Sequence, residues 1–346
     1  MKAGLVGYAQ TGKTTLFNAL TGQRALTGSG RRSKSNLGVI KVPDERLDRL
    51  TTLYRPRRTV PAEVLFVDVP GPHAKGTGLD GAIIQSLQEA DALVAVLRGF
   101  ESHEGIRPDP ARELSDFAAE LMLNDLAVVE RRLERLAKER GQDRQRAVLE
   151  RCLAALNAEQ PLRLVGFLPE DEREISAFSF LSLRPLLALL NRQETGGPQA
   201  ITTQLLETAQ RWNVQALDVC AAVEAEISTL PVAEQMDFLA GMGISEPASA
   251  KVIRAAYSLL DYVSFFTVGE DEVRAWTVRR GSKAPKAAGR VHSDMERGFI
   301  RAEVMAYDDF IAAGSEARMR ELGKLRVEGK EYVVQDGDIL NFRFAV

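Results

Sequence analysis

The fold of this chain is decided by Gly7-Tyr8-Ala9-Gln10-Thr11-Gly12-Lys13-Thr14. The stretch matches the phosphate-binding pattern G-x-x-x-x-G-K-[ST] in full. An apolar run at 3–6 precedes it, and apolar residues at helical spacing follow it, at Leu16, Phe17 and Leu20. This order of strand, glycine-rich loop and helix is the setting that the pattern requires, so a chance glycine-rich turn is the weaker interpretation.

The chemistry of the loop follows from its residue types. Gly7 and Gly12 let the backbone curl so that successive N–H groups point at phosphate oxygens. The helix that begins near Lys13 adds the positive end of its dipole. We expect Lys13 to reach the β- and γ-phosphates of a nucleoside triphosphate, and the Thr14 hydroxyl to ligate Mg²⁺.

Length and composition bound the remaining possibilities. The chain has 346 residues, which predicts two or three domains, and its net charge of −3 gives no global signal for nucleic acid. Its two cysteines, Cys152 and Cys220, lie far apart, which favours a reducing cytoplasm over a disulfide scaffold or a cysteine-rich zinc site. The first strand begins at once, without room for a signal peptide. No apolar run reaches the ~18 residues of a membrane span, so no membrane partner is expected.

Five short apolar runs predict strands that are buried on both faces, at 3–6, 64–67, 93–97, 186–190 and 214–219. Such runs are typical of a parallel α/β sheet, which binds its ligands at the carboxyl ends of the strands. Polar or glycine-containing segments follow three of the runs directly, at 7–14, 68–71 and 191–194. We therefore expect these three segments to form one site.

Residues 109–159 have a different texture, rich in alanine, leucine, glutamate and arginine. Apolar residues recur there at the a/d spacing of a coiled-coil seam, at Leu126, Val129, Leu133 and Leu136. Gly141 interrupts the pattern and a second apolar stripe follows, which predicts an antiparallel helical hairpin inserted into the nucleotide-binding domain. The charges along it form a solvated face or, less commonly for such charges, a binding surface.

The sequence from about residue 263 changes again. Strand-like runs at 265–268, 273–278, 332–334 and 339–344 surround turns and one helical stretch. Strands with a lone helix are typical of a small α+β module.

Asp68-Val69-Pro70-Gly71 follows the second predicted strand. In proteins with this phosphate-binding loop, an acidic residue here holds Mg²⁺, usually through water, and the glycine N–H approaches the γ-phosphate. The next residue is Pro72, where Ras-like switches carry a water-orienting glutamine. Hydrolysis is then slow or uses another group, for which the adjacent His73 is a candidate catalytic residue beside Lys13, Asp68 and Gly71.

Asn191-Arg192-Gln193-Glu194 follows the fourth predicted strand, where GTPases usually carry N-K-x-D. The aspartate of that motif accepts hydrogen bonds from guanine, and a glutamate is one methylene longer. Losing a paired acceptor weakens base selectivity by large factors, which favours ATP over GTP. The alternative is that Glu194 takes the place of the aspartate and the site still reads GTP.

Taken together, these residues resemble the YchF branch of Obg-related P-loop proteins, over nearly the whole chain. The N-x-x-E sequence is a mark of that family. Five further stretches are similar to its motifs: 36–47, 219–227, 273–277, 288–301 and 337–342.

The resemblance implies a fold, a set of domains and a function. The fold is a P-loop G-domain with a parallel sheet at 1–103 and 185–262, an inserted helical hairpin at 104–184, and a C-terminal TGS module of β-grasp fold at 263–346. The function is Mg²⁺-dependent hydrolysis of ATP, with GTP less favoured, in a cytoplasmic switch that acts on ribosomes or RNA through the TGS module and the hairpin.

The resemblance also implies binding residues by position. Six consecutive residues would wrap the phosphates: Gln10, Thr11, Gly12, Lys13, Thr14 and Thr15. Asn191 and the backbone of Arg192 would face the base, near Glu194. The family's fifth motif would border the nucleotide through Cys220 and Ala221.

Two departures from the family concern the γ-phosphate. Arg32 stands where the family has a threonine that ligates Mg²⁺, and Ser33 is the candidate replacement. Arg32 is either a solvated loop residue or an arginine finger supplied in cis. The loop after Gly71 is also shorter than in the family. We therefore expect nucleotide binding with slow turnover, and we keep two alternatives: a nucleotide-gated adaptor with negligible hydrolysis, and a GTP-specific switch.

A basic cluster near the C-terminal end leaves two interpretations open. It is either a phosphate-neutralising surface for RNA or an ordinary solvated face. Its cations are Arg279, Arg280, Lys283, Lys286, Arg290, Arg297 and Arg301, with Trp276 and Phe299 at its flanks.

Overall fold

The computed structural model describes residues 2–25, 35–71, 79–102, 104–139, 141–193, 202–241 and 246–345. The chain forms two compact units. The first unit comprises Met1–Ile40 and Leu65–Ala256, and the second comprises Lys41–Val64 and Tyr257–Val346. An N-terminal segment, residues 41–64, therefore belongs with the C-terminal unit, which the sequence did not predict. The three-domain division proposed from the sequence stays a prediction.

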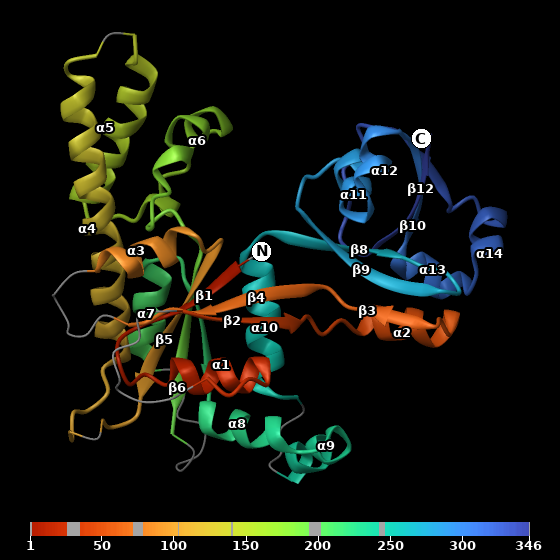
Figure 1. Ribbon diagram of the computed structural model, residues 1–346, viewed down its shortest axis with the longest axis horizontal. Helices are drawn as coiled ribbons and strands as arrows, with labels where there is room; N and C mark the ends of the chain where they lie inside the picture. Colours follow the sequence, from red (N-terminus) through yellow and green to blue (C-terminus); the bar gives the residue numbers. More distant parts are fainter. Residues whose placement is uncertain are drawn as a thin grey trace. The chain divides into compact units, whose positions relative to one another are not determined.

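The first unit is built on a six-stranded sheet with the order β2-β4-β1-β5-β6-β7 (Figure 1). The five predicted strands are confirmed, and β1, β4, β5, β6 and β7 pair in parallel. The edge strand β2 is an addition to the prediction. The strands are β1 (Lys2–Val6), β2 (Asn36–Lys41), β4 (Glu63–Asp68), β5 (Ala92–Gly99), β6 (Leu186–Arg192) and β7 (Gln215–Val219).

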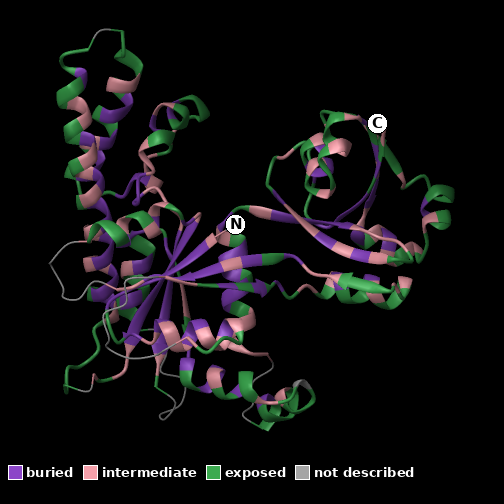
Figure 2. Cartoon of the chain, in the orientation of Figure 1, coloured by how far each residue is buried: buried purple, intermediate pink, exposed green. Residues whose placement is uncertain are grey.

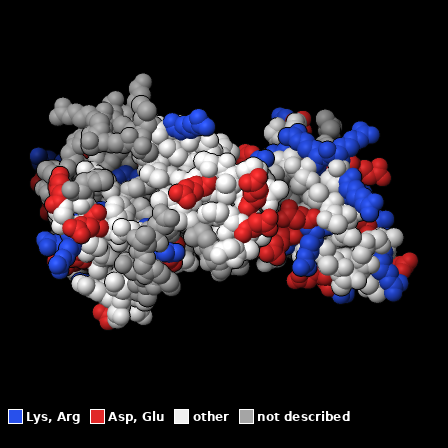
Figure 3. All heavy atoms as spheres, turned by 90° about the horizontal axis from the view of Figure 1, so that it is seen from below, with Lys and Arg blue, Asp and Glu red and all other residues white. Residues whose placement is uncertain are grey.

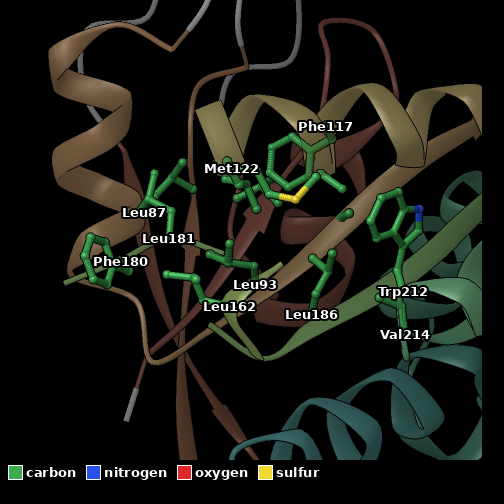
Figure 4. Close-up of a cluster of buried hydrophobic side chains, with 14 of the residues drawn as sticks. Leu87, Leu93, Phe117, Met122, Leu162, Phe180, Leu181, Leu186, Trp212 and Val214 are labelled. Carbon is green, nitrogen blue, oxygen red and sulfur yellow. The ribbon is translucent and has the colours of Figure 1, made fainter. Parts of the chain in front are cut away.

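Helices cover both faces of this sheet. A large apolar cluster joins alternate residues of β5, such as Leu93, to the helices α3, α4 (Pro110–Leu136) and α7 (Figure 4). Helix α1 contacts β1 and α8, and its buried residues Leu16 and Phe17 lie outside that cluster. Burial on both faces explains why β5 and β6 are continuous apolar runs (Figure 2). The helices are α1 (Lys13–Thr21), α3 (Gly81–Gln88), α7 (Thr203–Arg211), α8 (Ala221–Thr229), α9 (Val232–Gly241) and α10 (Ala248–Leu259).

The predicted helical hairpin is formed by α4 (Pro110–Leu136) and α5 (Asp143–Asn157), with α5 packed against the part of the longer α4 that lies nearest the turn (Figure 1). Asp109 caps α4 by accepting the backbone N–H of Arg112, and Gly141 turns the chain with φ of +82°. Short helices follow at Leu162–Leu164, α6 (Pro169–Ile175) and Ser176–Phe178.

One buried carboxylate fastens the base of the hairpin to the sheet. Asp125 of α4 is fully buried and accepts backbone N–H groups from Leu181 at 2.8 Å and Ser182 at 2.7 Å, just before β6. Burial raises the pKa of this carboxyl group, and the hydrogen bonds oppose that effect.

The second unit has its own six-stranded sheet, with the order β11-β10-β12-β8-β9-β3. The predicted runs at 265–268, 273–278 and 339–344 correspond to β8, β9 and β12. The prediction of a strand at 332–334 was wrong, because Val333 makes only an isolated bridge to Lys283. The strands are β3 (Arg58–Val60), β8 (Tyr262–Thr267), β9 (Glu272–Arg279), β10 (Phe299–Ala306), β11 (Arg326–Glu328) and β12 (Asp338–Phe344).

Helices cover both faces of the second sheet as well. On one face, α11 packs its alanines against a core that includes Phe265 and Leu340. The neighbouring Phe266 points the other way, toward Tyr307 and the guanidinium of Arg46. After residue 263, four helices replace the single predicted one: α11 (Ala284–Val291), α12 (Ser293–Arg297), α13 (Tyr307–Ala313) and α14 (Glu316–Glu321). Helix α2 (Glu45–Tyr54) is contributed by the segment 41–64. Within the part of the chain that the structure describes, no helix is long and apolar enough to cross a membrane.

Candidate functional site

The loop between β1 and α1 has the curled backbone that its glycines predict. Gly7 has φ of +133°, Gln10 of +63° and Gly12 of +89°. Gly12 precedes the first residue of α1, and its carbonyl accepts the backbone N–H of Leu16 at 2.9 Å. A side chain at Gly12 would collide with the amide group of Asn191, so this position requires glycine for space as well as for conformation.

Lys13 is buried beneath the loop. Its Nζ donates to the carbonyl oxygen of Tyr8 at 2.5 Å, and only 8% of the residue is exposed. Burial lowers the pKa of Lys13 to about 8, while the charges of Asp68 and Glu113 act in the opposite direction. The lysine is thus a cation held in a desolvated place, where an anionic ligand interacts strongly.

Asp68, at the end of β4, joins two segments of the site. Its Oδ2 accepts hydrogen bonds from Thr14 Oγ1 at 2.9 Å and from Asn36 Nδ2 at 3.1 Å. The hydroxyl and the carboxylate are adjacent hard oxygen donors, which suits Mg²⁺ with further ligands from phosphates and water. Among the described residues no group of three or more His, Cys, Asp or Glu could hold a metal.

Gly71 lies directly on the phosphate-binding loop. A side chain there would collide with the carbonyl of Gly7 and approach Lys13 Nζ to 2.9 Å. The structure thus brings together Lys13, Thr14, Asp68 and Gly71, as the sequence predicted. Five residues named in the sequence arguments lie outside the described residues: Arg32, Ser33, Pro72, His73 and Glu194.

Asn191 ties the phosphate-binding loop to the turn before α8. It is 4% exposed; its Nδ2 donates to the carbonyl of Thr11 at 2.9 Å, and its Oδ1 accepts the backbone N–H of Ala221 at 3.0 Å. The predicted group of Asn191, Cys220 and Ala221 is therefore adjacent to the loop, with Cys220 just before α8. These bonds hold the loop at the edge where the sequence predicts the base.

The side chain of Arg192 is directed to a residue that the sequence did not single out. Its Nε donates to Asp218 Oδ2 at 2.9 Å, across the paired strands β6 and β7. Asp218 is a charged residue within the apolar run 214–219. This exception to the apolar pattern was the signal in the sequence that its side chain has a specific partner.

Helix α4 brings further acidic groups to the loop. Tyr8 donates its hydroxyl to Glu120 Oε1 at 3.2 Å, and Glu113 accepts the backbone N–H of Arg98 at 2.9 Å. Burial and the nearby Glu120 and Asp116 raise the pKa of Tyr8 well above its ordinary value. These acidic residues share one face of α4, so their spacing of three and four was a signal in the sequence.

The basic cluster of the second unit is largely paired with carboxylates. The ion pairs join Arg280 to Asp261, Lys283 to Glu331, Lys286 to Glu296 and Arg297 to Asp294. On the face of the second unit that Figure 3 shows, acidic side chains also lie among lysines and arginines. Phe299 is buried and Trp276 is stacked under Arg274, so neither aromatic ring presents an open face in the described structure.

Known proteins match this chain over its full length. A family model described as a 50S ribosome-binding GTPase matches residues 2–132, and the model YchF-GTPase_C, described as a protein of unknown function, matches residues 262–345. The ribosome-binding ATPase YchF of Bacillus subtilis (strain 168) is 39% identical over 364 residues, with 100% of both chains covered. Its counterpart from Haemophilus influenzae is 41% identical over 360 residues, which cover 100% of this chain and 99% of the relative.

The fold has also been seen experimentally in a relative. The solved structure of the Schizosaccharomyces pombe YchF GTPase has a TM-score of 0.88 and 29% sequence identity, and the match covers 99% of this chain and 97% of that one. This similarity confirms the predicted fold class: a P-loop G-domain with helical and C-terminal additions.

Proposed function

Because this chain belongs to the YchF family, we propose that it binds ATP with Mg²⁺ at the loop 7–14 and hydrolyses it slowly, as a ribosome-associated switch in the cytoplasm. The observation that carries the proposal is the hydrogen bond of 2.9 Å between Thr14 and Asp68, beside Gly71 and the buried Lys13. A phosphate cradle, a cation and two oxygen donors for a metal meet at this point.

Each residue has a distinct part in the proposed reaction. Lys13 and the loop N–H groups neutralise and orient the phosphates. Thr14 and Asp68 would hold Mg²⁺, which supplies positive charge to the β- and γ-phosphate oxygens. The Gly71 N–H approaches the γ-phosphate. Ser33 and His73 remain proposals for a further metal ligand and a water-positioning group.

The proposed preference for ATP rests on the base-binding side of the site. Asn191 and the turn at Cys220 and Ala221 border the loop. Arg192 is paired with Asp218, so its side chain is engaged on this side of the site. The preference itself is inferred from Glu194, which is one methylene longer than the aspartate that accepts hydrogen bonds from guanine.

The ribosome is proposed as partner from the relatives. Two relatives are ribosome-binding ATPases by name, and one matching model is that of a 50S ribosome-binding GTPase. We place the contact with the ribosome or its RNA on the hairpin and on the second unit. Four of the seven cations of the basic cluster are paired with carboxylates, so RNA phosphates bound there would compete with these ion pairs.

A phosphate-release assay tests the proposed activity. Purified protein is incubated with Mg²⁺ and ATP or GTP, and Lys13→Ala is the matched control. Slow release from ATP that vanishes in Lys13→Ala and without Mg²⁺ is the expected result. Tight ATP binding with no release above the Lys13→Ala background would instead identify a nucleotide-gated adaptor.

A further inference from the structure

We propose that the segment 41–64 transmits the nucleotide state of the first unit to the second unit. The inference rests on the proposed function, because the signal that it carries is the bound nucleotide. The segment folds with residues 257–346, from which it is separated by almost two hundred positions in the sequence. The basis of the inference is how the segment is held in the second unit and where its two ends lead.

The segment is an integral part of the second unit. Its strand β3 pairs in parallel with β9, where Arg58 lies opposite Glu272. The pairing is extended by backbone bonds from Arg57 to Glu270 and from Arg58 to Asp271, and Arg57 forms an ion pair of 3.3 Å with Asp271. The backbone pairing in register with β9 places β3 at the edge of the second sheet, and the exposed ion pair adds little to it.

Helix α2 is fastened at both of its ends. At its start, Arg46 forms an ion pair of 2.8 Å with Asp336, and its guanidinium lies 5.3 Å from the centre of the Phe266 ring. At its end, the ring of Tyr54 stacks on Phe310 with centroids 5.9 Å apart. Asp336 in turn accepts the backbone N–H of Ser264 in β8, so that a shift of α2 acts on the central strands of the second sheet.

The ends of the segment lead straight to the candidate site. The backbone passes between the two units after Ile40, before Leu65 and after Ala256. The first two of these passages lie in β2 and β4, which are neighbours in the first sheet. Strand β2 starts with Asn36 and β4 ends with Asp68, the two residues joined by the hydrogen bond of 3.1 Å.

Asp68 therefore connects nucleotide binding with the position of β2. Its Oδ2 is shared by Thr14 and Asn36, so a ligand that draws on Asp68 or Thr14 changes the bond that holds Asn36. In this proposal a displacement at Asn36 or Asp68 passes along β2 and β4 as paired, rigid elements. The second unit would then respond through α2 and β3, which are continuous with β2 and β4.

Hydrogen exchange on the full chain tests the proposal. Exchange is followed by mass spectrometry without nucleotide, with Mg²⁺ and ADP, and with Mg²⁺ and a non-hydrolysable ATP analogue. We expect amides of α2 and β3 to differ in exchange rate between the two nucleotides by about fivefold or more, the lower end of usual coupling strengths. Unchanged exchange in both elements, with both nucleotides bound, would overturn the proposal.

A pair of variants tests the same coupling from the second unit. Arg46→Ala removes the link to Asp336, and Thr52→Ala, on the exposed side of the same helix, removes a hydroxyl that donates to the carbonyl of Asp48 within α2. By reciprocity, Arg46→Ala should change the ratio of ATP-analogue to ADP affinity by about fivefold, and Thr52→Ala should leave it unchanged. Equal ratios in wild type and both variants would contradict the coupling. If neither the ATP analogue nor ADP binds wild-type protein in calorimetry, the proposed function is refuted, and the coupling with it.

Discussion

Raising the pH from 7 to 9 should weaken ATP binding about tenfold, because the buried Lys13 then loses its proton before the nucleotide arrives. Its pKa is about 8 in the structure. About nine-tenths of the molecules carry the charged lysine at pH 7 and about one-tenth at pH 9, and a triphosphate favours the charged form. Binding should therefore take up about 0.1 proton at pH 7 and about 0.9 proton at pH 9.

Isothermal titration calorimetry in pairs of buffers with different ionisation enthalpies measures this proton uptake directly. Lys13→Arg is the matched control, because its guanidinium stays charged throughout the range. The uptake at pH 9 should disappear in that variant. Proton uptake near zero in wild-type protein at pH 9, or equal uptake in wild type and Lys13→Arg, would refute the assignment of Lys13 as the buried phosphate-binding cation.

Three further substitutions test other parts of the account. Gly12→Ala should abolish ATP binding in calorimetry, because the new side chain collides with Asn191; binding at wild-type strength would contradict the geometry of the loop. Thr14→Val keeps the shape but deletes the hydroxyl beside Asp68, so Mg²⁺-dependent phosphate release should fall about tenfold or more, and an unchanged rate speaks against the metal site. Asp125→Ala leaves two buried N–H groups without acceptors and should lower the free energy of unfolding by about 2–4 kcal/mol in urea denaturation, whereas a loss below about 0.5 kcal/mol would show that these bonds matter little.

The sequence was sufficient to predict the parallel strands of the first sheet and the proximity of Lys13, Thr14, Asp68 and Gly71. Strands such as β5 and β6 are buried on both faces, so their apolar runs are continuous and easy to recognise. The loop at 7–14 carries its own geometry in its glycines. Asp68 and Asn191 follow predicted strands directly, and parallel strands bring such positions to one edge.

The missed elements depend on contacts that a local pattern does not contain. Strand β2 alternates between the exposed Leu37 and Val39 and the buried Ile40, and Gly38 interrupts its apolar pattern. Strand β3 has only three residues and pairs with β9, more than two hundred positions later. A strand so short exists only because of its distant partner, so the membership of segment 41–64 in the second unit was not predictable from its own residues.

Side-chain roles were missed for a similar reason. Asp125 lies in a helix rich in charged residues and was indistinguishable there from a solvated group, although it is fully buried. The pairing of Arg192 with Asp218 crosses two strands that are separated by a helix in the sequence. In both places the role of the side chain depends on a partner that is distant in sequence: the backbone at 181–182 for Asp125, and the carboxylate of Asp218 for Arg192.

Competition between ATP and GTP for one site is the decisive test of the proposed binding of ATP at the loop 7–14. A fluorescent nucleotide bound in the presence of Mg²⁺ is displaced by increasing concentrations of either triphosphate, with Lys13→Ala as the control for binding at the loop. ATP should displace the probe at a lower concentration than GTP does. In Lys13→Ala the probe should not bind at the loop, so neither triphosphate should change its signal. Displacement by GTP at much lower concentration than ATP would contradict the account.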